Sequence, residues 1–390
     1  MRNVSRNHRS TFLVFGSPTI EEQDIEEVVA TLRSGWIGLG PKVKQFECAM
    51  AAYVGATNAI AVNSCTAALH LSLLALGIGA GDEVITTPMT FAATANTIIH
   101  TGARPVFADV NRTTMLIDPQ EIESVITSRT KAILPVHLAG RPCPMDEIAM
   151  IARRHGLHII ADAAHCIEGQ YKGRHIASCS DLTCFSFYVT KNITTAEGGM
   201  VITNNDVWAK RIRILSQHGM DRDAFTRFTD AGYRDYDVVA PGYKYNMTDL
   251  QASIGLHQLA RIDASWHRRD QIWSRYDSGL SDLPIHCPPP VEHYSRHARH
   301  LYTPLVYESE CGVNRDELAR NLKRRQIGTG VHYRPLHLHD YYRRAFGFTD
   351  GTYPNAEWIG GGTISLPLSA GLTDQDVDDV LEAIHDSVLC

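Results

Sequence analysis

The alternation of short apolar runs with helix-like segments between residues 58 and 215 limits the possible folds of this chain more than any other feature. Most runs are short, several are rich in Val and Ile, and the connections are mostly helical. This pattern predicts an α/β fold with a mostly parallel seven-stranded sheet covered by helices on both faces. The predicted strands are Asn58–Val62, Glu83–Thr87, Pro105–Asp109, Lys131–Val136, Leu157–Asp162, Leu182–Phe187 and Gly199–Thr203, and the predicted helices are Thr66–Leu76, Phe91–His100, Pro119–Ile126, Met145–Arg154 and Asp206–Leu215.

Beyond about residue 249 the pattern changes. A long helical stretch, a proline-rich break, two strand-like runs and a closing helix follow, at Thr248–Leu280, Cys287–Pro290, Leu301–Val306, Thr363–Leu366 and Asp374–Val388. We therefore expect a large domain over residues 17–250 and a smaller α+β domain over residues 251–390.

The N-terminal segment is basic, because Arg2, Arg6, His8 and Arg9 are not balanced by any acidic side chain before residue 11. It contains no apolar stretch of the kind that a secretory signal requires. A short transit peptide is one alternative, but a flexible arm over residues 1–16 is the simpler expectation.

Composition excludes several classes of function. The net charge of −6 argues against a nucleic-acid-binding protein, which is normally basic. No apolar run approaches the length of a membrane span. The nine cysteines are scattered without a C-x-x-C pair, which favours reduced thiols in a cytoplasmic protein over a disulfide framework or a zinc site.

Lys191 follows an apolar strand-like run and precedes small, hydroxyl-bearing and glycine residues. An ammonium group is costly to place at the buried end of a sheet, so this position indicates a use for the amine. A lysine of this kind commonly forms a Schiff base with an aldehyde, and pyridoxal 5'-phosphate (PLP) is the commonest cofactor aldehyde. The alternative is a lysine that extends its charged end into solvent.

Asp162 ends another apolar run. PLP needs a carboxylate partner that keeps its pyridine nitrogen protonated. Taken alone, Asp162 is better explained as a helix N-cap. Asp162 and Lys191 together, each at the end of a strand of one sheet, favour a PLP site.

Further residues match the other parts of PLP. Ser64, Cys65 and Thr66 lie between a strand and an apolar helix, where backbone amides and hydroxyls bind phosphate, and Ser186 is a second hydroxyl donor. Phe91 follows a strand end and is placed to stack on the pyridine ring. Simple helix capping by Ser64 and core packing of Phe91 are the alternatives.

The segment Val331–His339 contains three histidines. A metal site is a weak explanation for them, because no carboxylate or cysteine nearby completes a ligand set. We expect no metal.

Six ordered motifs give the chain a clear resemblance to the sugar aminotransferases of the DegT/DnrJ/EryC1/StrS family, which are fold-type-I PLP enzymes with an aspartate-aminotransferase-like fold. The resemblance runs from about Ser17 to the C-terminus. The motifs are Ser34–Pro41, Asn63–His70, Asp162–His165, Phe185–Gly199, Gly242–Asp249 and Val331–Tyr333.

The resemblance implies catalytic roles for three residues. Lys191 would bind the PLP aldehyde, Asp162 would pair with the pyridine nitrogen, and His165 would contact the ring or its 3-hydroxyl group. Ala196 departs from the glycine that is more usual in the family before Glu-Gly-Gly, which affects the expected shape of this loop.

The resemblance also implies how the cofactor is held. Phe91 would stack on the ring, while the phosphate would be held by Ser64, Cys65 and Ser186. Asn246 would reach the phosphate from the other subunit of a homodimer.

As a member of this family, the chain would convert a keto group of a nucleotide-linked deoxysugar to an amine, with glutamate as the expected amino donor. Resemblance to relatives that aminate C4 favours that position over C3. We expect the substrate to contact Trp36, Lys244, His332, Tyr333 and Arg334. Lys244 and Arg334 are suited to a diphosphate, and a solvated surface role is the alternative for both.

Two other functions stay open. One is the PLP-dependent sugar dehydration that the family also performs, in which a histidine replaces the lysine. The other is a non-catalytic regulatory or scaffold protein with the same fold. Lys191 argues against the first, and the Lys191–Asp162 pair argues against the second.

Overall fold

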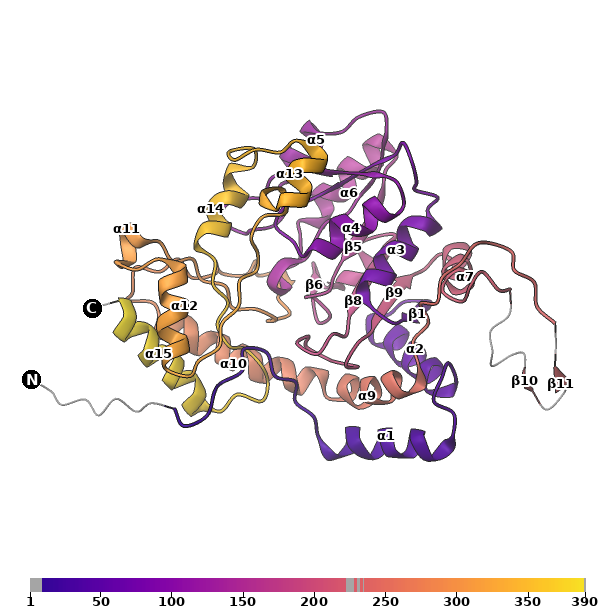
Figure 1. The fold of residues 1–390 in the computed structure, drawn as a ribbon, viewed down its shortest axis with the longest axis horizontal. Helices are drawn as coiled ribbons and strands as arrows, with labels where there is room; N and C mark the ends of the chain where they lie inside the picture. The colour runs from indigo at the N-terminus through magenta and orange to yellow at the C-terminus, as the bar shows by residue number, and fades with distance from the viewer. Residues whose placement is uncertain (1–8, 222–227, 230–231, 234, 389–390) are drawn as a thin grey trace, which may run out of the picture.

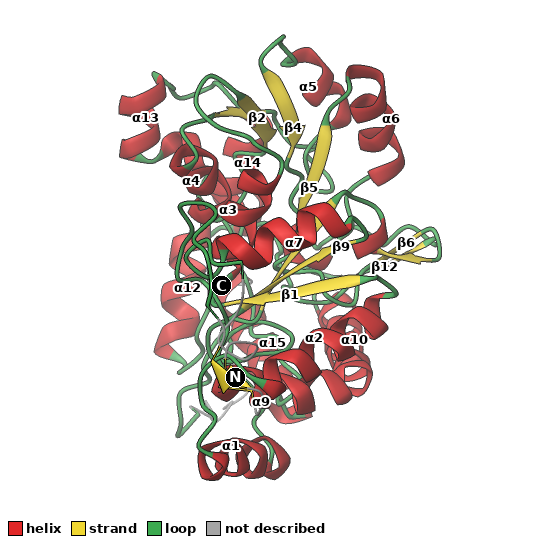
Figure 2. Cartoon of the chain, turned by 90° about the vertical axis from the view of Figure 1, so that its right-hand side faces the viewer, coloured by secondary structure: helices red, strands yellow, loops and turns green. Residues whose placement is uncertain are grey.

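The computed structural model of the chain describes residues 9–221, 228–229, 232–233 and 235–388. Its centre is a seven-stranded sheet in which only one strand, β9, runs against its two neighbours (Figures 1 and 2). The predicted, mostly parallel sheet is therefore confirmed. In spatial order the strands are β1 (Asn58–Val62), β9 (Gly199–Thr203), β8 (Leu182–Ser186), β5 (His158–Asp162), β4 (Thr130–Ile133), β2 (Glu83–Thr86) and β3 (Arg104–Phe107).

Helices cover both faces of this sheet, because side chains alternate between the faces along each strand. In β1, Ile60 and Val62 belong to an apolar cluster with three helices, whereas Ala59 and Ala61 belong to the cluster on the opposite face. The first face carries α3 (Cys65–Ala75), α4 (Ala92–His100) and α7 (Asp206–Leu215), and the second carries α2 (Pro41–Val54), α5 (Pro119–Ser124) and α6 (Met145–His155).

The directions of the strands bring many chain segments to one edge of the sheet. β1, β8, β5, β4, β2 and β3 all end at this edge, and the reversed strand β9 begins there. In open α/β sheets this is where ligands bind. The segments that follow Val62, Thr86, Asp162 and Ser186, and the segment that precedes Gly199, therefore lie close together.

The C-terminal part differs from the prediction in two places. The predicted single helix over Thr248–Leu280 is two helices, α9 (Asp249–Ala260) and α10 (Ile262–Gly279), which meet at Arg261. At this break the guanidinium of Arg261 binds Asp24, and it donates to the carbonyl of Thr19 at 3.2 Å.

The strands predicted at 301–306 and 363–366 are likewise not regular strands. Only isolated bridges join them, between Tyr302 and Leu366 and between Leu305 and Thr363. Here the apolar side chains pack into clusters without forming a continuous ladder.

A third apolar cluster is built from α10, α12 (Arg315–Arg324) and α15 (Asp374–Val388). α13 (Asp340–Phe346) and α14 (Pro354–Gly362) instead lie beside α4 and the end of the edge strand β3, where Leu336 and Tyr342 pack against Ala95 and Phe107. The boundary between two domains at residue 250 stays a prediction.

The remaining elements of the described residues are α1 (Glu22–Ser34), α11 (Glu308–Cys311), the sheet of β6 (Gln170–Tyr171), β7 (Arg174–His175) and β12 (Ser295–Arg296), the pair β10 (Phe228–Thr229) and β11 (Gly232–Tyr233), and three 3-10 turns at Leu138–Gly140, Ile176–Ser178 and Leu336–Leu338.

Residues 9–16, which fall within the predicted arm, lie along the C-terminal part. Arg9 pairs with Asp376 at 2.7 Å, and Leu13 is buried in the cluster of α10, α12 and α15. Phe15 stacks on His332 with ring centroids 5.6 Å apart. This part of the predicted arm is therefore packed. Residues 1–8 lie outside the described residues.

Ala196 has a left-handed backbone, with φ of 65°. A residue with a Cβ pays roughly 1–2 kcal/mol for this conformation, which glycine adopts without strain. The glycine that the resemblance leads one to expect here therefore has a conformational cause, and Ala196 keeps the same loop shape at some cost.

We predict that Ala196→Gly stabilises the protein by about 0.5 kcal/mol, because relief of strain exceeds the added freedom of the unfolded chain. The change in unfolding free energy between variants, measured by urea titration, tests this. Ala30→Gly, at an exposed position inside α1, is the matched control and should cost about 1 kcal/mol. A loss of stability in Ala196→Gly would contradict the strained backbone.

Candidate active site

A cavity of about 850 Å³ lies at the edge of the sheet where the parallel strands end. It contains most of the residues predicted from the sequence, which come from segments more than 250 residues apart. The predicted residues that line it are Ser64, Cys65, Thr66, Phe91, Asp162, His165, Ser186, Lys191, His332, Tyr333 and Arg334.

Asp162, the last residue of β5, is held in one orientation by two donors. The hydroxyl of Thr94 donates to Oδ2 at 2.8 Å, and the backbone N–H of Ala164 donates to Oδ1 at 3.1 Å. Burial raises the pKa of Asp162, and these two donors and the positive charge of Lys191 oppose that rise. A carboxylate fixed in this way can face a cationic ring nitrogen.

Lys191 lies in the loop between β8 and β9 and lines the same cavity. Burial lowers its pKa to about 8, although the nearby Cys65 and Asp162 act in the opposite direction. Roughly a tenth of the amine is therefore neutral at pH 7, far more than for an ordinary lysine, and the neutral amine is the form that reacts with an aldehyde.

The N-terminus of α3 supplies the groups for an anion. Ser64 is its N-cap, and the Ser64 hydroxyl accepts from the N–H of Ala67 at 3.1 Å. The amides of the first turn of a helix have no acceptor within the helix, so they are available to a phosphate. A Cβ on Gly199 would lie 2.4 Å from the carbonyl of Ser64, so only glycine lets β9 pass this close.

Aromatic and imidazole rings form another side of the cavity. Phe91 is 62% exposed and lines the cavity, so its ring is available to a ligand bound there. The ring of His165 is nearly parallel to that of Tyr333, at 21°, and its Nε2 lies 3.3 Å from the Tyr333 hydroxyl. Burial, reinforced by the charge of Lys191, holds the pKa of His165 well below its usual range.

A buried polar network that sequence reasoning missed lies behind the cavity. Glu168 and Arg269 form an ion pair whose side chains are 0% and 3% exposed. Asn192, next to Lys191, donates to Glu168 at 2.7 Å and to the carbonyl of Ala298 at 2.9 Å. Its side-chain oxygen lies 2.8 Å from Nδ1 of His300. No local sequence signal joins these positions, because they lie far apart in the chain.

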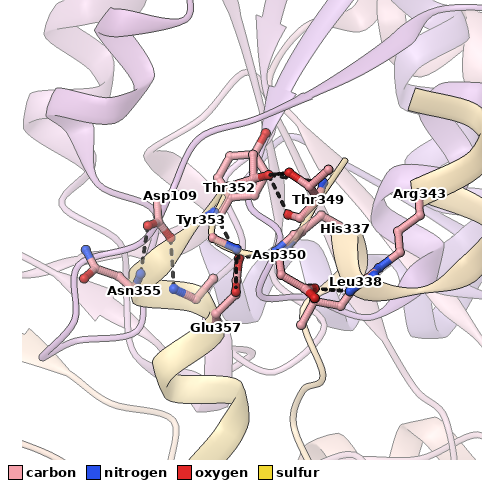
Figure 3. A network of polar contacts seen from close by, with 12 residues as sticks. Asp109, His337, Leu338, Arg343, Thr349, Asp350, Thr352, Tyr353, Asn355 and Glu357 are labelled. Carbon is pink, nitrogen blue, oxygen red and sulfur yellow. Dashed lines mark hydrogen bonds and ion pairs between the residues drawn. The ribbon is translucent and has the colours of Figure 1, made fainter. Parts of the chain in front are cut away.

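A second, partly buried network positions the segment 331–339 that lines the cavity (Figure 3). Nε2 of the fully buried His337 lies 2.9 Å from Glu357 Oε1, and Glu357 also accepts from the backbone N–H of Gly351 at 2.8 Å. Asp109 accepts from the first amides of α14, those of Asn355 and Ala356, both at 3.0 Å. The cavity wall is thus attached to the end of β3 through α14.

Three predicted residues do not line the cavity of the single chain. The indole N–H of Trp36 donates to the carbonyl of Leu39 at 2.9 Å, and Lys244 is exposed. Asn246 forms a backbone bridge with Val62, and its buried Oδ1 has no hydrogen-bond partner among the described residues. Their predicted roles stay predictions.

The three histidines of 331–339 have separate neighbours: His332 contacts the Ser365 hydroxyl at 2.7 Å, His337 contacts Glu357, and His339 lies 3.4 Å from the carbonyl of Arg334. The described part of the chain contains no group of three His, Cys, Asp or Glu side chains that could hold a metal ion. Within the same ranges, none of the helices combines the length and apolar character needed to cross a membrane.

Known proteins share this arrangement over nearly the whole chain. The model of the DegT/DnrJ/EryC1/StrS aminotransferase family matches residues 18–385. The chain is 51% identical over 384 residues to the spore coat polysaccharide biosynthesis protein SpsC of Bacillus subtilis, with 98% of each chain covered.

Solved structures share the fold over nearly the whole chain at lower sequence identity. The putative sugar aminotransferase Spr1654 of Streptococcus pneumoniae, in its PMP-form, has a TM-score of 0.90 at 37% identity, with 97% of this chain and 99% of that chain covered. PseC of Helicobacter pylori, an aminotransferase involved in the biosynthesis of pseudoaminic acid, has a TM-score of 0.89 at 27% identity, with 97% and 100% covered.

The residues of the cavity fit PLP. The amine of Lys191 suits its aldehyde, and the carboxylate of Asp162 suits its protonated ring nitrogen. The start of α3, with its first-turn amides and the Ser64 hydroxyl, suits its phosphate.

We predict that, in cofactor-free protein, Lys191 becomes reactive toward acetic anhydride with a midpoint near pH 8. Trace labelling followed by peptide mass spectrometry measures this. Lys172 is the control, because its hydrogen bond to Asp146 raises its pKa above the usual value. Asp162→Asn should move the Lys191 midpoint lower still, since one anion is lost. A Lys191 that titrates with the surface lysines would contradict the burial described above.

Proposed function

Because this chain belongs to the DegT/DnrJ/EryC1/StrS aminotransferase family of sugar aminotransferases, we propose that it moves an amino group from an amino acid to a keto carbon of a nucleotide-linked deoxysugar. Glutamate is the expected donor and C4 the favoured position. In the net reaction, the amino acid becomes a 2-oxo acid and the keto-sugar becomes an amino-sugar. The cofactor is PLP, as expected from the family and from the fit of the cavity.

The observation that carries the proposal is the presence of Lys191 and Asp162 on one cavity. When bound, PLP supplies the aldehyde that carries nitrogen and a ring that withdraws electrons. Lys191 binds that aldehyde and serves as the base and acid at the carbon that loses or gains the amine. Asp162, oriented by Thr94, keeps the ring nitrogen protonated.

Other residues of the cavity are assigned to holding the cofactor. We assign the phosphate to Ser64, Cys65, Thr66 and Ser186, the face of the ring to Phe91 and the ring edge to His165.

The sugar nucleotide is assigned to the outer part of the cavity. Arg334, at its exposed rim, offers a planar cation that suits a phosphate, with His332 and Tyr333 beside it. Trp36 and Lys244 are assigned to the same substrate, although they lie outside the cavity of the single chain. The SpsC relative acts in spore coat polysaccharide biosynthesis, which supports a polysaccharide as the destination of the amino-sugar.

A cytoplasmic location is part of the proposal. It rests on the cysteines, since all eight in the described ranges are free thiols.

A screen of nucleotide-linked 4-keto and 3-keto sugars with glutamate tests the proposed reaction. We expect formation of 2-oxoglutarate and of an amino-sugar with a 4-keto substrate, and loss of the visible PLP band on addition of glutamate alone. Lys191→Ala should abolish both signals, whereas Lys172→Ala, at an exposed loop position, should retain them.

Three results would contradict the proposal. No 2-oxoglutarate with any keto-sugar would exclude the reaction, and a nitrogen-free deoxysugar product would indicate the dehydratase. A PLP band insensitive to glutamate would indicate a non-catalytic protein.

We further propose an obligate homodimer in which Asn246 completes the cofactor site of the partner subunit. Mixing Lys191→Ala and Asn246→Ala subunits should then restore about one quarter of wild-type activity, the share expected for random exchange. The restored site would contain Lys191 from one chain and Asn246 from the other. If Asn246 served its own chain, no site would be free of both changes, and the exchanged mixture would be no more active than its parents.

A further inference from the structure

Tyr333 occupies a distinctive place in the cavity. Its ring lies against His165 and also 6.2 Å from the ring of Phe91, at 45°. It therefore borders both the ring-edge and the ring-face positions assigned above. Its hydroxyl is the only part of this side chain that can form a hydrogen bond, so the direction of that hydrogen determines what Tyr333 can recognise.

The direction of the Tyr333 hydroxyl hydrogen follows from the neighbours of His165. The backbone N–H of Ala139 lies 3.3 Å from Nδ1 of His165, and an amide N–H can only donate. Nδ1 therefore accepts, and the hydrogen of the neutral imidazole is on Nε2. That Nε2–H donates to the Tyr333 oxygen at 3.3 Å. The hydroxyl hydrogen of Tyr333 must then point away from His165.

The imidazole stays neutral and in place for physical reasons. Burial and the charge of Lys191 keep the pKa of His165 well below its usual range, so Nδ1 does not gain a second proton. His300, with its ring centroid 4.5 Å away, packs against His165.

His300 is itself fixed by Asn192. The carbonyl of Ala298 can only accept, so the amide nitrogen of Asn192 faces it and the amide oxygen faces Nδ1 of His300. His300 therefore donates through Nδ1. Burial also lowers the pKa of His300 well below its usual range, so this ring adds no charge beside His165.

We propose that Tyr333 is a hydrogen-bond donor of fixed direction, oriented by His165, for an oxygen acceptor bound in the cavity. The acceptor is a carbonyl, hydroxyl or anionic oxygen, carried by the cofactor, by the amino acid or by the keto-sugar. For the two substrates this rests on the proposed function, whereas for the cofactor it does not.

Tyr333→Phe tests the proposal, because it removes the hydroxyl and keeps the ring. Three measurements distinguish the source of the acceptor: the PLP dissociation constant and absorption spectrum of substrate-free protein, the half-reaction with glutamate, and the half-reaction with the keto-sugar. We expect either the PLP affinity or the rate of one of the two half-reactions to fall about tenfold or more, as for the loss of a hydrogen bond to a ligand. Tyr341→Phe, an exposed tyrosine outside the cavity, is the matched control and should change none.

A second variant separates the donor role from a structural one. Tyr333→Phe leaves the Nε2–H of His165 without its acceptor, which could itself disturb the site. In a His165→Leu background this N–H is absent, so Tyr333→Phe should still weaken the same measurement if Tyr333 donates to the ligand. No further loss in that background, or all three measurements within twofold of wild type for the single variant, would overturn the proposal. If wild-type protein fails to aminate any keto-sugar, the proposed function fails, and the PLP measurements still decide the role of Tyr333 toward the cofactor.

Discussion

The ion pair between Glu168 and Arg269 is the interaction on which the site most depends. It joins the loop after β5 to α10, and almost none of either side chain reaches solvent. Removing one partner of such a pair leaves an uncompensated charge in the interior, at a cost of about 3–5 kcal/mol. Because Glu168 also accepts from Asn192, the pair fixes the residue next to the reactive lysine. The position of the amine is thus coupled to the packing of the C-terminal helices.

Strand direction explains why the site could be predicted in outline. Apolar runs that end in a polar residue are visible in the sequence, and parallel strands bring such ends to one edge. This is why Ser64, Asp162, and the pair Ser186 and Lys191, from three separate segments, are found on one cavity. Which strand runs antiparallel was not predicted from the sequence; β9 reverses direction after residues 187–198, a connection that contains no helix.

The parts that could not be predicted depend on contacts between distant segments. Thr94 orients Asp162 from 68 residues away, and His300 meets Asn192 across 108 residues. Neither residue belongs to a local pattern that would distinguish it from an ordinary helix or loop residue. The break at Arg261 likewise coincides with its bonds to Asp24 and Thr19, while the helical pattern itself continues. Trp36, Lys244 and Asn246 were predicted from motifs, and they lie outside the cavity of the single chain. In the proposed dimer, residues of this kind would act in the site of the partner subunit.

The packing of residues 9–16 constrains the order in which parts of this protein can fold during synthesis. Arg9 bonds to Asp379, 370 residues later, and Leu13 shares an apolar cluster with Val377 and Ile384. A ribosome adds about 5–20 residues per second, so the docking surface for this segment is not complete until roughly 20–70 s after the segment is made. Before α15 is synthesised, only the part of the apolar cluster that comes from α10, α12 and Ile327 can cover Leu13. The packing of residues 9–16 therefore cannot be completed until α15 has been synthesised.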